Sequence, residues 1–276
     1  MEIKTVVTKE IVDAVCAAVE KAGEEVMRFY KKEDLVIQQK SDESPVTEAD
    51  ETANNILTKL LSSFGWPILS EETKDTPDRL KAPFVWIIDP IDGTRDFIEQ
   101  TGEFCIMVGL SEYGRSTFGV VHFPATKTTY YGGTELGAFF KQGDEEKPLS
   151  VSLVSTPEEA TMVMSKSHSL PIYESIAEKL GIKNVARVGS NGLKCSLVAS
   201  GTADIFYTIT SKLGEWDMCA PHAIVEAAGG MVSGIDGTTL TYNKEDPHIP
   251  QGVLVTNGLL QDVLLDTFVE QDINPR

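Results

Sequence analysis

Cysteine is scarce in this chain of 276 residues, and its four cysteines lie far apart, without the spacing of a metal-ligand cluster or a disulfide framework. This scarcity argues against a disulfide-rich secreted domain and favours a reducing compartment. Long apolar runs are also missing, so no segment of the sequence is expected to span a bilayer. Because the first residues lack the basic-then-apolar pattern of a secretory signal, we expect a cytoplasmic protein.

Basic residues are few relative to acidic ones. The chain has 24 Lys and Arg residues against 42 Asp and Glu residues, which gives a formal net charge of −18 at pH 7. No basic stripe is available to neutralise phosphates, so nucleic acid and anionic membranes are disfavoured as partners. An acidic protein still binds an anionic substrate if bound cations invert the local field.

Apolar spacing predicts the elements. Residues 9–30 and the segment after Thr47 show helical periodicity. Short β-rich segments divided by turn signals follow at 67–72, 84–89, 104–111, 117–123, 128–132 and 138–141. Beyond residue 161 strands and helices alternate, with strands at 162–165 and 203–207 and helices at 170–180, 193–200 and 217–228. We predict an N-terminal unit over residues 1–148 and a C-terminal α/β unit over residues 149–276.

The most informative segment is the run from Trp86 to Phe97. Asp89 and Asp92 stand three residues apart at the end of an apolar β segment, and Gly93 and Thr94 follow at once. The carboxylates are hard oxygen ligands for divalent cations, and the backbone N–H groups beside them suit a phosphoryl group. A bare pair of this kind is equally a strand end followed by an Asp-Gly turn, with Thr94 as a helix N-cap.

Other carboxylates occupy comparable places. Glu71 ends a short strand, Asp217 begins an alanine-rich helix, and Asp50 follows Thr47 as in a capped helix start. Taken singly, each is a cap, a turn former or a solvated charge. If they converge they repel one another unless cations neutralise them. Because no His or Cys accompanies them in the sequence, such a site suits Mg²⁺ better than Zn²⁺.

These motifs resemble those of the lithium-sensitive, Mg²⁺-dependent phosphatase superfamily, which includes inositol monophosphatase, fructose-1,6-bisphosphatase and 3′(2′),5′-bisphosphate nucleotidase. The D-P-[IL]-D-G-T motif is present as Asp89 to Thr94, and W-D followed by A-G-G is present as Trp216-Asp217 and residues 228–230. The T-x-x-D and S-E-E elements are residues 47–50 and 70–72. The resemblance implies an α/β fold, a five-layer αβαβα sandwich with an antiparallel N-terminal sheet and a smaller mixed C-terminal sheet.

The same resemblance assigns roles to residues. Glu71, Asp89 and the carbonyl of Ile91 would hold one Mg²⁺, and Asp89, Asp92 and Asp217 a second. Two or three ions are implied, with Mn²⁺ as a substitute and Li⁺ as an inhibitor.

The resemblance also implies how water and phosphate are held. The N–H groups of Gly93 and Thr94 would bind the phosphate. The Thr94 hydroxyl, hydrogen-bonded to Asp50 and assisted by Glu71, would orient the attacking water. Glu72 would hold an outer-shell water.

Three further segments resemble bisphosphate nucleotidases, namely residues 165–168, 189–194 and 216–221. A substrate with a second phosphate and an adenine needs a cation away from the metals and a ring face near the base. In these segments Lys194 would supply the cation and His168 the face, with Ser190 also on the substrate. Inositol monophosphatases carry a Glu seven residues before the W-D aspartate, whereas this chain has Thr210, which disfavours inositol phosphates.

The predicted reaction is removal of the 3′-phosphate of adenosine 3′,5′-bisphosphate, by a monomer as in the nucleotidases. Two departures leave alternatives open. Nucleotidases read Lys-Glu where this chain has Arg95-Asp96, and the Tyr207-Thr208 position offers no cation. Binding of the distal phosphate would therefore rest more heavily on Lys194, with Lys166 or Lys212 as candidates to assist it. The alternatives are an inositol or broad-specificity sugar monophosphatase, and a non-catalytic relative that binds metal and anion. On a helix surface Lys194 would be a solvated charge.

Overall fold

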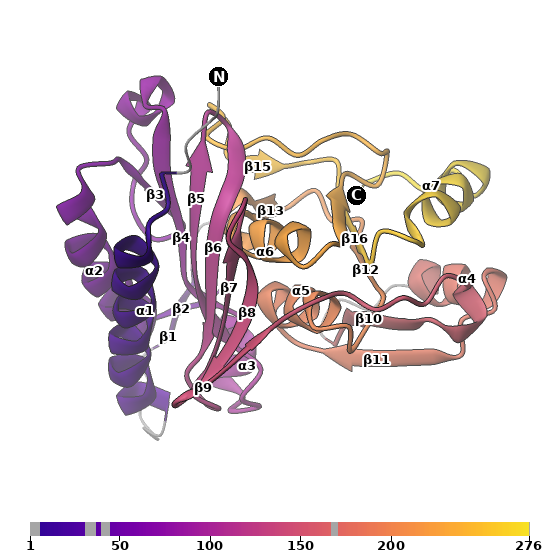
Figure 1. Ribbon diagram of the computed structural model, residues 1–276, viewed down its shortest axis with the longest axis horizontal. Helices are drawn as coiled ribbons and strands as arrows, with labels where there is room; N and C mark the ends of the chain where they lie inside the picture. The colour runs from indigo at the N-terminus through magenta and orange to yellow at the C-terminus, as the bar shows by residue number, and fades with distance from the viewer. Residues whose placement is uncertain (1–5, 31–36, 40–44, 167–170, 276) are drawn as a thin grey trace.

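The computed structural model describes residues 6–30, 37–39, 45–166 and 171–275, and two main sheets alternate in it with three layers of helices (Figure 1). Three clusters of buried apolar side chains fill the spaces between helices and sheets. This arrangement confirms the predicted α/β sandwich. Among the described residues, none of the helices combines the length and the apolar character that crossing a membrane requires.

Helices α1 (Lys9–Tyr30) and α2 (Glu48–Leu61) cover one face of the first sheet (Figure 1). Both helices were predicted from apolar spacing. The apolar residues of α1 form one buried stripe, as that spacing predicts. Helix α2 begins with a capping box, in which the Thr47 hydroxyl accepts from the Ala49 N–H at 3.1 Å and Asp50 accepts from the Thr47 N–H at 2.8 Å. The capped start predicted at Thr47 is therefore confirmed.

The first sheet has seven strands in the order β3-β4-β5-β6-β7-β8-β9. Their bounds are Ile68–Ser70, Phe84–Asp92, Cys105–Glu112, Arg115–Phe123, Thr128–Gly133, Gly137–Gln142 and Glu145–Pro148. The predicted antiparallel pairing is confirmed from β4 to β9, whereas at one edge β3 pairs parallel to β4 with Ile68 opposite Trp86. The physical reason is the connection, because the chain crosses over through the 3-10 helix η2 (Pro77–Lys81) before it enters β4. The carboxyl ends of β3 and β4 consequently lie at the same edge.

Helices α5 (Asn191–Ala199) and α6 (Glu215–Ala227) form the middle layer (Figure 1). Helix α6 approaches the first sheet very closely, because Gly109 and Gly119 leave room for its backbone. A Cβ atom on Gly119 would lie 2.1 Å from the carbonyl oxygen of Ala220. The helix begins two residues before its predicted start, so Asp217 lies within its first turn.

The second sheet has five strands in the order β11-β10-β12-β16-β14, and it is mixed as predicted. The bounds of these strands, in chain order, are Thr161–Ser165, Asn184–Val188, Ile205–Thr208, Met231–Ser233 and Val253–Thr256. Helices α4 (Pro171–Lys179) and α7 (Gln261–Glu270) cover its outer face. Two small two-stranded sheets complete the fold, β1 (Ile37–Gln39) with β2 (Pro45–Thr47) and β13 (Leu213–Gly214) with β15 (His248–Ile249). The division at residue 148 stays a prediction.

Candidate active site

Strand β4 delivers two of the predicted carboxylates to one place. In a regular strand, residues three apart point to opposite faces of the sheet. Between Asp89 and Asp92, however, the pairing of β4 with β5 shifts register, as at a β-bulge. Both side chains are buried, with 1% of Asp89 and 6% of Asp92 exposed. The irregularity therefore explains how a D-x-x-D motif converges on a single site.

Asp217 completes a cluster of three carboxylates. Each of Asp89, Asp92 and Asp217 offers one oxygen, and these atoms lie within 4.8 Å of one another. Burial, together with the charges of Asp92 and Glu71, raises the pKa of Asp217. A divalent cation would relieve the repulsion between these carboxylates, so the donor set fits Mg²⁺.

Each member of the cluster is oriented by hydrogen bonds. Asp217 accepts from the Gly214 N–H at 2.7 Å and from the Asn191 side-chain amide at 3.1 Å. The Asp89 carboxylate accepts from the Ile91 N–H at 3.0 Å. Because these bonds fix the carboxylates before any ion arrives, the site is preorganised.

Asp92 is tied to the start of α5. One of its oxygens accepts from the Gly192 N–H at 2.7 Å and from the Ser190 hydroxyl. Ser190 caps α5 by accepting from the Leu193 N–H at 3.1 Å, and its backbone has a φ of +54°. A left-handed conformation is costly for a non-glycine residue and is held here by the surrounding bonds. Ser190, predicted on the substrate, thus lies against Asp92.

Glu71 follows β3 at the same edge of the sheet as Asp89. Its N–H donates to the Ile88 carbonyl at 3.3 Å, which places the start of the Glu71-Glu72 pair beside β4. The side chain is half-buried, and its charge contributes to the raised pKa of Asp217. The parallel pairing of β3 with β4 thus brings Glu71 to the same edge of the sheet as Asp89, while the cluster within 4.8 Å consists of Asp89, Asp92 and Asp217.

Thr94 and Asp50 meet as predicted. The Thr94 hydroxyl lies 3.3 Å from one Asp50 oxygen and 3.1 Å from the Ile91 carbonyl oxygen. The other Asp50 oxygen accepts from the Thr47 hydroxyl at 2.6 Å, so the capping box of α2 also orients Asp50. The N-cap interpretation of Thr94 is wrong, because Gly93, with a φ of +90°, is the cap of α3 (Thr94–Ile98). The Thr94 hydroxyl therefore faces the predicted site.

Lys194 is not a solvated charge, since only 3% of it is exposed. Its ammonium group lies 5.2 Å from the centre of the Phe206 ring, and no ion pair of the described residues includes it. Burial lowers the pKa of Lys194, while the charges of Asp92, Asp96 and Asp217 raise it. The structure thus provides a buried cation near the carboxylates. It also shows that Phe206 contacts this cation, a role that nothing in the apolar sequence of β12 had predicted.

The remaining predicted residues are His168, Lys166, Lys212 and Thr210. His168 lies outside the described residues. The ammonium group of Lys166 lies 3.5 Å from a Glu103 oxygen, on the surface. The Thr210 hydroxyl accepts from the Lys212 N–H at 3.3 Å, and Lys212 itself is exposed.

Arg95 and Asp96 stand where nucleotidases have Lys-Glu, and the two side chains lie in different environments. Asp96 is buried, and burial raises the pKa of its carboxyl. It accepts from the Thr101 hydroxyl at 2.9 Å, and a Cβ atom on Gly189 would lie 2.3 Å from it. Gly189 is therefore needed where the 189–194 segment passes this carboxylate, whereas Arg95 is exposed.

Two residues at the site were not predicted. Asn191 lies inside the 189–194 segment, in which only Ser190 and Lys194 were assigned roles. Its place in this segment was the one feature of the sequence that pointed to a role at the site. Glu215 precedes the W-D pair, and it is fully buried. The pKa of Glu215 is raised to about 7 by burial, against the effect of hydrogen bonds from the Lys244 and Asn243 N–H groups.

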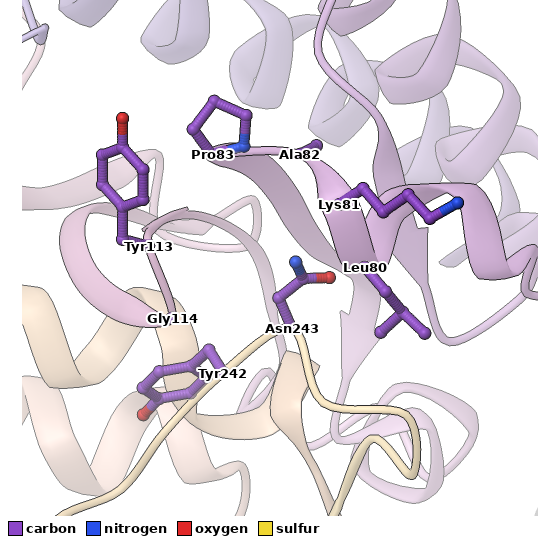
Figure 2. Close-up of a pocket in the computed structure, with 8 residues that line it drawn as sticks. All are labelled: Leu80, Lys81, Ala82, Pro83, Tyr113, Gly114, Tyr242 and Asn243. Carbon is purple, nitrogen blue, oxygen red and sulfur yellow. The ribbon is translucent and has the colours of Figure 1, made fainter.

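A cavity of about 480 Å³ lies elsewhere, beside the loop that contains Tyr242 and Asn243 (Figure 2). None of the residues that line it is a predicted site residue. The substrate is therefore expected at the carboxylates rather than in this cavity.

Fold and site together define a layered α/β protein whose carboxylate cluster could hold a metal ion. The chain belongs to the inositol monophosphatase family, whose model matches residues 8–271. It is 30% identical over 261 residues to the 3′(2′),5′-bisphosphate nucleotidase CysQ of Aggregatibacter actinomycetemcomitans, covering 93% of this chain and 96% of that protein. For CysQ of Salmonella typhimurium the identity is 32% over 250 residues, covering 89% and 99%.

Solved structures of members of this family have the same fold as this chain. The IMPase of Thermotoga maritima superposes with a TM-score of 0.80 at 27% identity, covering 96% of this chain and 100% of that one. CysQ of Bacteroides thetaiotaomicron, described as a bacterial member of the same family, gives 0.78 at 28% identity, covering 92% and 99%. The chain is therefore a phosphoric monoester hydrolase.

Proposed function

We propose that this hydrolase is Mg²⁺-dependent and removes the 3′-phosphate of adenosine 3′,5′-bisphosphate, with the corresponding 5′-phosphosulfate as a related substrate. The observation that carries the proposal is the buried Lys194, a cation near the carboxylates and without an ion-pair partner among the described residues. Relatives named 3′(2′),5′-bisphosphate nucleotidase support it. The enzyme is further proposed to act as a cytoplasmic monomer.

Glu71, Asp89 and the Ile91 carbonyl would hold one Mg²⁺, while Asp89, Asp92 and Asp217 would hold another. Two or three ions fit this proposal, with Mn²⁺ as a substitute and Li⁺ as an inhibitor. Bound Mg²⁺ supplies neutralisation of phosphate charge and acidification of coordinated water. The clustering of Asp89, Asp92 and Asp217 supports this assignment.

Asp50 and Thr94 are proposed to handle the attacking water. Asp50 accepts a hydrogen bond from the Thr94 hydroxyl. The lone pairs of the Thr94 oxygen would then face the water and accept a hydrogen bond from it. Glu71 assists as a second acceptor. The N–H groups of Gly93 and Thr94 would donate to the phosphate oxygens.

Lys194 is proposed to bind the 5′-phosphate, the one that is not hydrolysed. A charged phosphate relieves the cost of keeping the ammonium group buried, and an ion pair out of water is strong. Ser190 and His168 are proposed to contact the rest of the nucleotide. Thr210 supplies no carboxylate for inositol hydroxyls, which disfavours an inositol phosphate.

Phosphate release from adenosine 3′,5′-bisphosphate, inositol 1-phosphate and fructose 1,6-bisphosphate, each with and without Mg²⁺, tests the proposal. We expect strong Mg²⁺-dependent preference for the nucleotide. Preference for either of the other two substrates would support the monophosphatase alternative, which the likeness to the Thermotoga maritima IMPase also favours. No turnover of any substrate would favour a non-catalytic binding protein.

A further inference from the structure

The carboxylates proposed to hold metal come from two distant parts of the chain, β3 and β4 on one side and helix α6 on the other. Cation affinity depends on how firmly these parts are held together. A network of buried polar groups lies next to the first turn of α6. It consists of Arg79, Glu215 and Asn243, and we call it the clamp.

Glu215 is the centre of the clamp. One of its carboxylate oxygens accepts from the Asn243 N–H at 2.6 Å, and the other accepts from the Lys244 N–H at 3.0 Å. The Glu215 N–H donates to the Pro247 carbonyl at 2.8 Å. Both ends of this one residue thus fasten the start of α6 to the loop of residues 243–247.

The residues just before α6 are held by the same stretch of chain. Gly214 of β13 pairs with His248 of β15, and Leu213 pairs with Ile249. The Gly214 N–H also donates to the Asp217 carboxylate at 2.7 Å. A shift of this loop would therefore be felt at Asp217.

Arg79 connects the loop to the other half of the site. Its guanidinium donates to the Asn243 side-chain oxygen at 2.8 Å, and the Asn243 amide donates back to the Arg79 carbonyl at 3.0 Å. Arg79 lies in η2, between Glu71 and Asp89 in the chain, and is 1% exposed. In Figure 2 the Asn243 side chain points toward the segment with Leu80 and Lys81, which directly follow Arg79 in the chain.

We propose that the clamp is a positioning network that fixes Asp217 relative to Glu71 and Asp89 and so sets the affinity of the cluster for Mg²⁺; this inference rests on the proposed function. Buried charges contribute little to stability compared with apolar side chains of similar size. What a satisfied polar network provides is a single defined geometry. Arg79, Glu215 and Asn243 touch none of the three clustered carboxylates in the described hydrogen bonds, so their effect on the ion would pass through the backbone.

Calorimetric titration of the full chain with Mg²⁺ alone tests the clamp. Asn243 has a φ of +58°, so Asn243→Gly keeps the backbone conformation and removes only the bonds to Arg79. Glu215→Gln turns an amide toward a backbone N–H. We expect each to weaken Mg²⁺ binding by roughly 10-fold, the lower end of what losing a direct outer-shell partner costs, because the effect passes through the backbone. Added Mg²⁺ should restore most of the phosphatase rate.

Glu226→Gln is the matched control, a change of the same kind on the same helix, where the carboxylate contacts His222 instead. It should leave Mg²⁺ binding unchanged. Lower thermal stability of Asn243→Gly with wild-type Mg²⁺ affinity would overturn the inference, and so would equal effects of Glu226→Gln. If Glu215→Gln does not fold, Asn243→Gly still decides.

Because no nucleotide is present in the titration, a wrong substrate assignment leaves its result intact. A wild-type chain that binds no Mg²⁺ would overturn both the proposed cofactor and the clamp. Normal Mg²⁺ binding by the wild type and by both variants would overturn the clamp alone.

Discussion

The two faces of the seven-stranded sheet are covered by helices of opposite character. On the outer face, α1 buries only apolar or small residues, namely Val12, Val15, Cys16, Ala18, Val19, Ala22, Gly23 and Val26. On the inner face, α5 and α6 bury Lys194, Glu215 and His222 as well as apolar groups. Buried polar groups are costly unless they are partnered. The comparison indicates that the inner face carries most of the buried polar groups of the site, to which the outer face adds Asp50 at the start of α2.

The two faces also differ in how closely helix and sheet approach. Gly109 and Gly119 let the backbone of α6 lie against the inner face, whereas α1 and α2 pack through side chains. Such contact leaves α6 little freedom to move. Asp217, a proposed metal ligand, is thereby held on a rigid element.

The largest effect is expected at the inner edge of the sheet, from Asp89→Asn. Loss of one charge of the cluster should lower Mg²⁺-dependent turnover by on the order of 10³-fold, the upper end for one electrostatic contact. The metal-free protein should not be less stable, because repulsion within the cluster falls. Steady-state rates and thermal melting check both points, and unchanged activity would remove Asp89 from the site.

A smaller effect is expected from Asp50→Asn. Asp50 lies on the outer helix α2 and contacts Thr94 of the proposed site. The substitution should lower kcat by roughly 100-fold and leave Mg²⁺ affinity nearly unchanged, because Asp50 acts on Thr94. Thr47→Ala removes a hydroxyl that orients Asp50 but keeps the acceptor for Thr94, so it should lower kcat less than Asp50→Asn does, at about 1 kcal/mol of stability. A fall in Mg²⁺ affinity alone would show that the Thr94–Asp50 pair is wrongly assigned.

Two matched glycine substitutions compare the faces directly. In Gly119→Ala the new Cβ meets the backbone of α6, and in Gly23→Ala, on α1, it meets the His122 ring at 2.8 Å. Each should cost about 1–3 kcal/mol through overpacking. Only Gly119→Ala should also weaken Mg²⁺ binding, by about 10-fold, through a displaced α6. Equal Mg²⁺ affinity in the two variants would contradict the division of roles between the faces.

The smallest effect on activity is expected at His122, on the outer face. Burial lowers the pKa of His122 to about 4. Below its unfolded pKa of about 6.5 the unfolded chain binds a proton that the folded chain does not. The stabilisation is therefore complete above pH 6.5 and is lost as the pH falls toward 4, by about 3 kcal/mol in total.

Urea unfolding at pH 7.5 and pH 5 measures this loss. Stability of the wild type should fall more steeply between these pH values than that of His122→Gln, while turnover at pH 7.5 is similar in both. His248→Gln, which changes an exposed histidine, should behave as the wild type does. Identical pH slopes in wild type and His122→Gln would disprove the assignment.

Local patterns predicted the elements and the antiparallel run of β5 to β8, but not the direction of β3. Helix α1 and the Thr47 cap were predictable because periodicity and capping depend on neighbouring residues. The parallel entry of β4 beside β3 depends on the crossover through η2, and the register shift at Asp89–Asp92 depends on the pairing of β4 with β5. No local pattern specifies either. The layered sandwich came from the resemblance.

The candidate site shows the same limit. Its carboxylates were predicted because they lie in motifs. The burial of Lys194 against Phe206 depends on which face of α5 meets the second sheet, which tertiary packing decides. Asn243 and Arg79 are 164 positions apart, and only the folded chain brings them together.

The central claim is that the inner face carries a site for a substrate with two phosphates, one at the carboxylates and one at Lys194. The most direct test is the ratio of kcat/KM for adenosine 3′,5′-bisphosphate to that for adenosine 3′-monophosphate, in wild type and in Lys194→Met. The wild type should prefer the bisphosphate by roughly 100-fold or more, as expected for a buried charge pair, and the ratio should fall toward one in the variant. An unchanged ratio in Lys194→Met, or no preference in the wild type, would contradict the claim.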